Sequence, residues 1–260
     1  MSNQRSRFAR AANILAAIVV SVAMVGPASI AAAQTSDLPP AREIVDRFVA
    51  AIGGADAVRQ YKSRRAVGTF NVPAQGITGT LEVLAAAPDR QLLRIHINGI
   101  GEIQQGYDGR VAWLIDPMTG PRLLEGAAYS QMQMDADFYG ELHDAKHYAK
   151  IETVAREEFE GIPAYKVRLI RPSGEEDFEY FAVDGGLLVG NSVTRMSPMG
   201  PMPATTVFGE YKDVGGVRLA TRVVQKVMGV EQVMTLTTIE HDTLDASVFA
   251  LPASIKALVK

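Results

Sequence analysis

The chain has 260 residues, of which 47% are hydrophobic and 21% are charged, and it contains no cysteine. This composition excludes collagen-like, disulfide-stapled and disordered chains, and the lack of thiolates excludes a cysteine-ligated structural zinc site. With a net charge of −3 the chain has no basic footprint for nucleic acid, so no nucleic-acid partner is expected.

The first 33 residues have the pattern of a secretory signal peptide. A positive segment precedes an apolar run over residues 14–25, and a small-residue cleavage motif follows. The positive residues are Arg5, Arg7 and Arg10. Since a membrane span takes about 20 apolar residues, we predict cleavage between Ala33 and Gln34, a periplasmic location and no integral span afterwards. Residues 34–260, with a net charge of −6, are expected to fold as a single domain.

An amphipathic helix is predicted at the start of this domain. Pro39 and Pro40 can open it, because the N–H that proline lacks has no partner in the first turn of a helix. Apolar residues then recur at helical spacing, at Ile44, Phe48, Ala51 and Ile52. Gly53-Gly54 is expected to end the helix.

From Arg64 onward the apolar period falls to two residues, which predicts antiparallel strands with one dry and one wet face. About eleven strands are expected, over residues 64–72, 77–86, 90–97, 101–107, 110–115, 151–157, 163–171, 176–183, 187–196, 204–212 and, as a pair, 217–240. Consecutive hairpins without crossover helices predict a meander, and a single sheet of this length must curl.

The segment from Gly126 to Tyr148 interrupts the strands. Its apolar stripe at helical spacing consists of Met134, Phe138, Leu142 and Ala145. Because Gly140 weakens the pattern, two short helices fit it as well as one. We therefore predict a mainly β fold of the α+β kind, in which a single curled antiparallel sheet forms an unclosed half-barrel. The N-terminal helix and the central helical insert would serve as its lid.

The concave face of such a sheet either fills with side chains or keeps a cavity for an apolar guest. Strand faces rich in Leu, Ile, Val and Met would bind acyl chains through burial alone, at about 0.8 kcal/mol per CH₂. The expected lining residues are Leu81, Val83, Leu93, Ile95 and Met134. Alternation alone fits an open cavity and a filled interior equally well.

Two short motifs carry a resemblance to a known superfamily. The Gly-Tyr-Asp-Gly-Arg-Val-Ala-Trp stretch from Gly106 to Trp113 resembles a hairpin of lipoprotein-sorting proteins, and the closing Asp245-x-x-x-Phe249-x-Leu251-Pro252 resembles their C-terminal signature. With the order of the elements, these motifs make the chain similar to the LolA/LolB-like superfamily of periplasmic lipoprotein and lipid carriers. The resemblance implies an unclosed barrel with a helical lid and a hydrophobic cavity. No Arg of this chain aligns with the cavity-mouth Arg of LolA-type carriers.

A pair of histidines could hold a metal ion. His143 and His147 are four residues apart, which on a helix puts both imidazoles on one face and resembles the H-E-x-x-H motif of zinc hydrolases with Asp144 at the acid position. A hydrolytic zinc site also needs a third ligand and a general base, and no third ligand stands out. The alternative is a polar face beside the apolar stripe, and no metal or other cofactor is assigned.

Other residues have a structural and a functional interpretation each. Met196, Met199 and Met202 could bind Cu(I), gate a cavity or belong to a plain loop, which Pro198, Pro201 and Pro203 would stiffen. Trp113 is expected to fill a core rather than to stack on a ligand. His96 and His241 are expected to be solvated.

Three hypotheses follow for the function. The first is a non-catalytic periplasmic carrier that holds lipid or a lipidated protein in a half-barrel cavity and works with envelope transport components. The second is a metal-dependent hydrolase that uses His143 and His147. The third is an envelope assembly scaffold whose interior is filled. Co-purifying lipid, bound zinc, or a crosslinked partner with neither would distinguish them.

Overall fold

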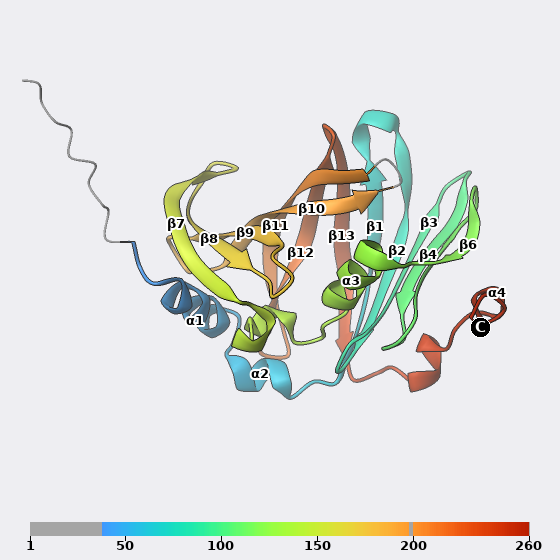
Figure 1. Ribbon diagram of the computed structural model, residues 1–260, viewed down its shortest axis with the longest axis horizontal. Helices are drawn as coiled ribbons and strands as arrows, with labels where there is room; N and C mark the ends of the chain where they lie inside the picture. The colour runs from blue at the N-terminus through green and yellow to red at the C-terminus, as the bar shows by residue number, and fades with distance from the viewer. Residues whose placement is uncertain (1–37, 198–199, 260) are drawn as a thin grey trace, which may run out of the picture. The chain divides into compact units, whose positions relative to one another are not determined.

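The computed structural model describes residues 38–197 and 200–259, and Asp37–Lys260 form one compact unit. The predicted signal peptide and Met199 lie outside the described residues. Thirteen strands form one antiparallel sheet that is not closed into a barrel (Figure 1). The predicted mainly β fold with an unclosed half-barrel is therefore confirmed. None of the helices in the described ranges has the length and apolar character that a membrane crossing requires.

The sheet consists of two meanders that meet where β1 pairs with β13. The N-terminal meander contains β1 (Ser63–Val72), β2 (Ile77–Ala86), β3 (Arg90–Ile97), β4 (Gly101–Tyr107), β5 (Ala112–Asp116) and β6 (Gly120–Leu123), with η1 (Pro73–Gln75) between β1 and β2. The C-terminal meander contains β7 (Lys150–Phe159), β8 (Ile162–Ile170), β9 (Glu176–Ala182), β10 (Leu188–Ser197), β11 (Gly200–Val214), β12 (Val217–Val227) and β13 (Val230–His241). Both run outward from the β1–β13 seam, so β6 and β7 are the two edges of the sheet.

The predicted strand ranges agree with the structure, except at β6 and at the start of β11. β6 was missed because Gly-Pro-Arg-Leu is short and lacks alternation. The prediction of a stiff proline loop is wrong for Pro201 and Pro203, which lie in β11 and pair with β10. β12 joins β11 only from Ala204 onward, so both prolines lie where β11 has a single neighbour, a position that tolerates a missing N–H.

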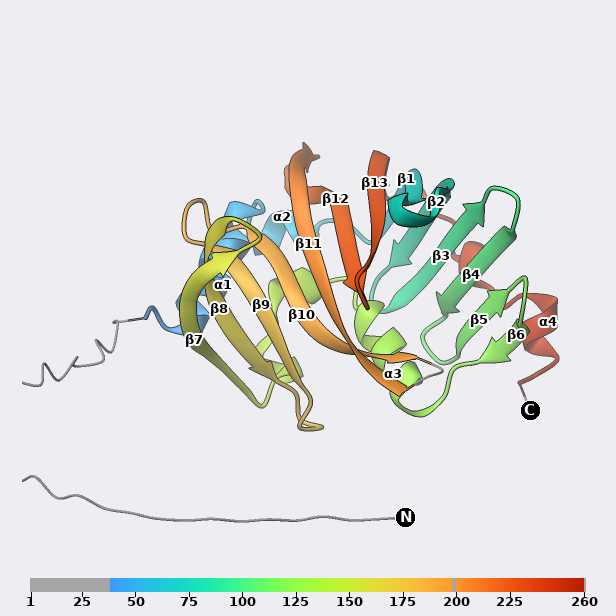
Figure 2. The ribbon, with the colours of Figure 1, turned by 90° about the horizontal axis from the view of Figure 1, so that it is seen from above.

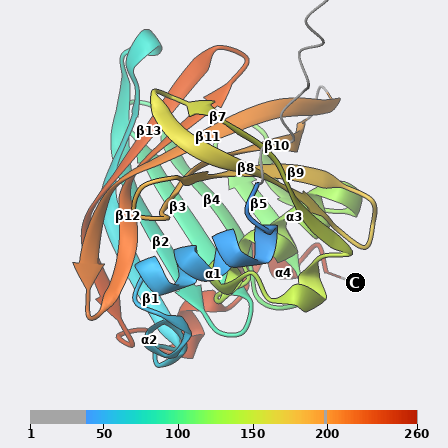
Figure 3. The same ribbon diagram turned by 90° about the vertical axis from the view of Figure 1, so that its left-hand side faces the viewer.

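Helix α1 (Ala41–Ala51) confirms the predicted N-terminal helix, and α2 (Ala55–Arg59) follows it. Ile44, Val45 and Phe48 of α1 are buried in the largest apolar cluster. Their partners on the sheet include Val167, Leu169, Phe181, Val217 and Leu219, all of the C-terminal meander. Figure 3 looks onto α1 with the strands behind it. Helix α1, which lies early in the chain, therefore covers the C-terminal meander.

On the other face of the sheet, C-terminal elements pack against the N-terminal meander. There η4 (Ala246–Phe249) and α4 (Ala253–Lys256) place Phe249 and Ile255 in a cluster with side chains of the N-terminal meander. Those side chains are Leu84, Leu92 and Trp113. Trp113 is 3% exposed, which confirms the core interpretation. Its ring lies on Gly106, where a Cβ atom would come within 2.6 Å of it, so this motif is a packing signature.

The chain crosses from one edge of the sheet to the other between β6 and β7. This connection contains α3 (Gly126–Asp135) and two short 3₁₀ turns, η2 (Gly140–Leu142) and η3 (Ala145–His147). The predicted insert thus consists of one α-helix, which ends before Gly140, and two 3₁₀ turns after it. The sheet curls, and α3 lies inside the curve (Figure 2). The insert therefore covers the concave face.

Candidate functional site

The predicted strand residues lie together on one face of β2 and β3. The register pairs Leu81 with Ile95 and Val83 with Leu93. Directly paired residues of antiparallel strands point to the same face. Leu93 also pairs with Gln105 of β4, whose amide contacts the sulfur of Met132 in α3 at 2.9 Å. All four side chains are therefore on the concave face, which α3 covers.

Neighbouring strands extend this apolar surface. Its buried members are Phe70, Val72, Leu81 and Ile97, and its half-buried members are Ile77, Val83, Ile95, Ile103, Val230, Met234 and Leu236. Together with half-buried Leu93 we call these residues the concave apolar face. Sequence reasoning missed its part on β13, although Met234 and Leu236 alternate with polar residues. Most of the face keeps solvent contact, so apolar area remains for a further partner.

Helix α3 contacts β4, β5 and β10. Within α3, all of which the structure describes, Met132 is the one buried residue. Gln133 and Tyr129 add hydrogen bonds to the hydroxyl of Tyr107, both at 3.4 Å. Burial and the neighbouring Tyr129 raise the pKa of Tyr107 to about 12, so this hydroxyl stays neutral. Helix α3 thus lies against β4 and β5 through Met132 and these hydrogen bonds.

Met134, the fifth predicted lining residue, lies on a different side of α3 from Met132. Two helical positions differ by about 200°, so the half-buried Met134 points away from β4 and β5. α3 also contacts β10 on the other meander. The structure therefore brings together the four strand residues, while Met134 lies on a different side of α3 from Met132.

The insert is fastened at its other end by a buried ion pair between His143 and Glu179 of β9. The Nε2 atom of His143 lies 2.6 Å from Oε2 of Glu179, and its Nδ1 atom lies 3.0 Å from the carbonyl of Glu141. Both neighbours accept hydrogen bonds, so both ring nitrogens are donors. Burial opposes this charged form, but Glu179 and the hydrogen bonds outweigh it and raise the pKa of His143 above 6.5.

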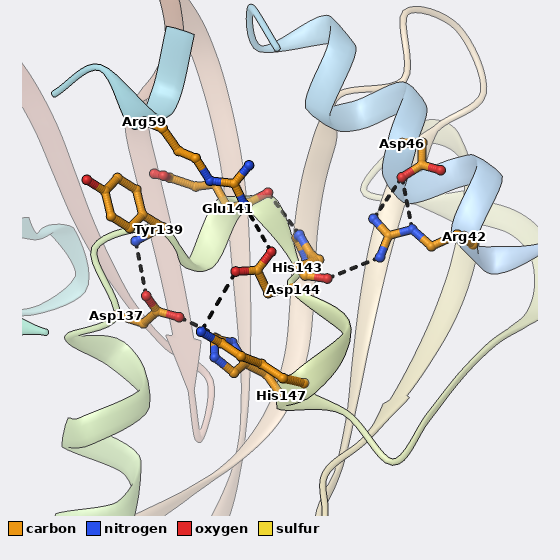
Figure 4. A network of polar contacts seen from close by, with 10 residues as sticks. Arg42, Asp46, Arg59, Asp137, Tyr139, Glu141, His143, Asp144 and His147 are labelled. Atoms are coloured by element: carbon orange, nitrogen blue, oxygen red, sulfur yellow. Dashed lines mark hydrogen bonds and ion pairs between the residues drawn. The ribbon is translucent and has the colours of Figure 1, made fainter. Parts of the chain in front are cut away.

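The backbone around His143 is held from α1 as well. Arg42 donates to the His143 carbonyl at 3.1 Å, and Figure 4 shows this contact beside the Arg42–Asp46 pair. His143 has a φ of +49°, which is uncommon for a residue with a side chain. Phe48 and Phe181 contact its ring edge-on. Helix α1, the insert and β9 therefore meet at this residue.

The prediction that His143 and His147 share one helix face is wrong. His143 follows η2, whereas His147 is the last residue of η3. His147 pairs instead with Asp137, with Nδ1 and Oδ2 3.3 Å apart (Figure 4). The helical pattern was broken by Gly140 and by the left-handed backbone of His143. Among the described residues no three His, Cys, Asp or Glu side chains are grouped so that they could hold a metal ion.

The two remaining histidines differ from each other. His96 is exposed on β3, as predicted. His241 is half-buried and stacks on Tyr61 with ring centres 3.9 Å apart, so the prediction that it is solvated is wrong. Burial and the charge of Arg64, its partner across β1, lower the pKa of His241. Its strand position gave no sign of α2 and Tyr61 folding over it.

Two open pockets lie away from the concave apolar face. One, of about 350 Å³, lies between the strands and the C-terminal segment and includes Ser63, Arg90 and Phe249 in its lining. The other, of about 200 Å³, includes Val111, Leu124 and Tyr129. None of the five predicted lining residues borders either pocket.

Comparison with known proteins identifies the fold. No protein-family model matches the sequence, and no curated protein sequence does. Solved structures do match. A DUF1329 family protein from Desulfovibrio piger has a TM-score of 0.56 at 13% identity, over 83% of this chain and 99% of that one. A LolA superfamily protein from Nitrosomonas europaea has a TM-score of 0.54 at 14% identity, over 82% and 99%.

A third similar structure is a domain from Vibrio parahaemolyticus whose name assigns it to outer membrane lipoprotein sorting. Its TM-score is 0.51 at 14% identity, over 80% of this chain and 95% of that one. These similarities confirm the predicted resemblance at the level of the fold, which is LolA-like.

Proposed function

We propose that this chain is a non-catalytic periplasmic carrier that holds the acyl chain of a lipid or of a lipidated protein against its concave apolar face, under α3. The observation that carries the proposal is a surface of paired strands whose apolar side chains are largely half-buried and face the inside of the curve in which α3 lies. The names of the LolA superfamily and lipoprotein-sorting neighbours agree with it.

Burial is the whole binding force in this proposal. Each methylene that leaves water for the apolar face contributes about 0.8 kcal/mol, so a chain of ten methylenes gains about 8 kcal/mol before the cost of ordering it. The half-buried members, such as Val83, Ile95 and Met234, would provide the contact area. Displacement of α3 would admit the chain, while the sheet stays in place. Envelope transport components would load and unload it.

The first test is analysis of lipids that co-purify with the protein from a periplasmic fraction without detergent. Extraction and mass spectrometry are expected to recover lipid in stoichiometric amount. A protein free of lipid, and also unable to bind a fluorescent fatty acid, would overturn the proposal. Such a result would favour the scaffold with a filled interior.

Neighbouring residues on β3 give a matched pair of variants. Ile95→Asn places an amide on the concave apolar face, whereas His96→Asn changes an exposed side chain on the opposite face. Ile95→Asn is expected to weaken fatty-acid binding by about tenfold, which corresponds to about 1.4 kcal/mol, and His96→Asn is expected to leave it unchanged. Equal affinities in the two variants would place the ligand elsewhere.

A further inference from the structure

A row of polar side chains crosses one face of the C-terminal meander. The register pairs Gln232 of β13 with Gln225 of β12, and Gln225 with Thr206 of β11. It also pairs Thr206 with Asn191 of β10, and Asn191 with Glu179 of β9. Directly paired residues of antiparallel strands point to the same face, so all five side chains share one face. Neighbouring strands are about 4.8 Å apart, which makes the row roughly 19 Å long. We call these five residues the polar stripe.

Both ends of the polar stripe place it on the concave side of the sheet. At one end, Gln232 alternates on β13 with Val230 and Met234, which belong to the concave apolar face. At the other end, Glu179 contacts His143 of the insert, which covers that side. Figure 2 shows the strands that carry the stripe, β9 to β13, in the curve of the sheet. The stripe therefore begins where the concave apolar face ends.

Apolar side chains border the polar stripe along its middle strands. Residues two positions before and after a strand residue share its face. On β11, β12 and β13 these flanking residues are Ala204, Phe208, Val223, Val227, Val230 and Met234. The stripe is therefore a polar band within an apolar surface. Such a surface is complementary to an amphiphile, because its tail and its head each find a matching part.

Asn191 gives the polar stripe an unsatisfied group. Its Oδ1 atom is buried and has no hydrogen-bond partner among the described residues. A buried acceptor without a donor lowers the stability of a protein, and such groups are rare in native structures. Thr206 beside it is 6% exposed, whereas Gln225 and Gln232 are half-buried and remain in contact with solvent. A ligand with a donor group would supply the partner that Asn191 lacks.

We propose that the polar stripe binds the headgroup of the carried amphiphile through hydroxyl or amide groups, while the acyl chain lies on the concave apolar face. This inference rests on the proposed function and names the class of cargo. Glu179, the charged member of the stripe, is already paired with His143. The other four members carry amides or a hydroxyl, which both donate and accept hydrogen bonds. Their chemistry matches that of a glyceride or a sugar.

Two esters of oleic acid form a matched pair of probes. 1-Monooleoylglycerol carries free hydroxyl groups, whereas methyl oleate has the same acyl chain and the same ester but no hydrogen-bond donor. Each probe is measured by its displacement of a fluorescent fatty acid from residues 34–260, which contain the whole compact unit. Each ester is compared with itself between protein variants, so its solubility in water cancels.

The matched variants change the same residue types on opposite faces of the sheet. The stripe variant carries Asn191→Leu and Gln225→Leu. The control variant carries Asn71→Leu on β1 and Gln104→Leu on β4. Both control residues are half-buried, and they alternate with members of the concave apolar face and so point away from it.

The stripe variant is expected to lose about tenfold in affinity for 1-monooleoylglycerol and less than about twofold for methyl oleate, since a net hydrogen bond changes a binding constant several-fold. The control variant is expected to bind both esters like the unchanged protein. The denaturant midpoint of the stripe variant is expected to be no lower than that of the unchanged protein, because leucine removes the buried acceptor at Asn191. Gln225→Leu alone, at a half-buried position, is expected to lose about threefold for 1-monooleoylglycerol and serves if the double variant does not fold.

The two esters also separate this inference from the proposed function. Equal losses for both esters in the stripe variant, or no loss for either, would overturn the headgroup site and leave the proposed function in place. A lower midpoint with unchanged affinities would overturn it as well, because the stripe would then serve the fold alone. An unchanged protein that binds neither ester nor the fluorescent fatty acid would overturn the proposed function and this inference with it.

Discussion

At the scale of single residues, the most constrained side chain is His143. It is 4% exposed, its two nitrogens contact acceptors, and its own carbonyl accepts from Arg42. A buried ion pair contributes little net stability, but the loss of one partner leaves a charge without compensation. His143 therefore joins the insert to β9 only while Glu179 is present.

The stability of the protein is expected to depend on pH through His143. Its pKa is raised in the folded protein, so the stabilisation is fully present below the unfolded value of 6.5 and is lost as the pH rises through the folded value. Glu179→Gln is expected to cost about 3 kcal/mol at pH 6 and to flatten this decline. Urea unfolding from about pH 5 to about pH 9 measures both effects.

Glu157→Gln is the control for this experiment. Glu157 is an exposed carboxylate that pairs with Lys166 on a neighbouring strand, and its loss should cost less than about 1 kcal/mol at any pH. A pH profile of Glu179→Gln parallel to that of the unchanged protein would show that His143 is not the group responsible.

Two strand glycines differ sharply in the space around them. A Cβ atom on Gly190 would lie 2.3 Å from the ring of Phe159 and 2.4 Å from the carbonyl of Thr206, whereas one on Gly209 meets nothing within 4 Å. Gly190→Ala is expected to destabilise the protein by about 2 kcal/mol or more, and Gly209→Ala by close to zero. Denaturant midpoints measure the difference, and equal midpoints would contradict the close packing of Phe159.

At the scale of elements, the contrast lies between α3 and the strands that it covers. Hydrogen exchange is expected to be fast in α3, which buries Met132 alone, and slow in β1 and β2, which are paired on both sides. Saturation with a fatty acid is expected to slow exchange in α3 more than in the strands. Exchange in α3 as slow as in β1 would mean that the helix is not a movable cover.

The C-terminal helix can be followed through the single tryptophan of the chain. Ile255 of α4 is fully buried beside Trp113. Ile255→Ala is expected to shift the fluorescence of Trp113 to longer wavelength and to cost about 3 kcal/mol, since it leaves a cavity next to the ring. Leu258→Ala changes an exposed neighbour and is expected to do neither. An unshifted Ile255→Ala spectrum would mean that α4 does not shield the tryptophan.

The elements also show how far the sequence could predict this structure. The alternation of apolar and polar residues, together with glycines at the hairpins, located the strands that bury one face. A strand that buries every second residue needs an apolar residue at every second position. β6 escaped because a four-residue edge strand with Gly and Pro buries too little. The prolines of β11 were misread because their tolerance depends on where β12 begins, which is a tertiary fact.

For the candidate site the limits were similar. The pairing of Leu81, Val83, Leu93 and Ile95 on one face could be predicted, since register in hairpins follows from turn length. The partnership of His143 with Glu179 could not, because the two lie 36 residues apart on an irregular turn and a strand. The prediction that His143 and His147 lie on one helix face failed for a related reason. A spacing of four residues brings two side chains together only on an α-helix, and none forms there.

At the scale of the whole described unit, the sheet has two unpaired edges with different protection. β6 is contacted by α4, whereas β7 carries charges along its length, among them Lys150, Glu152 and Glu157. Charges on an edge strand hinder pairing with a second sheet. Charged side chains therefore protect β7, and α4 protects β6.

The exchange of helices between the two meanders has a consequence for the order of events in the cell. α1 completes the core of the last strands, and Ile255 of α4 completes that of the first, so neither half has its full core alone. β1 likewise finds its partner β13 only after about 160 residues more have been made. Neither core can therefore be complete before Ile255 and its neighbours have been made. Both cores of a chain built this way are completed together, as one cooperative unit.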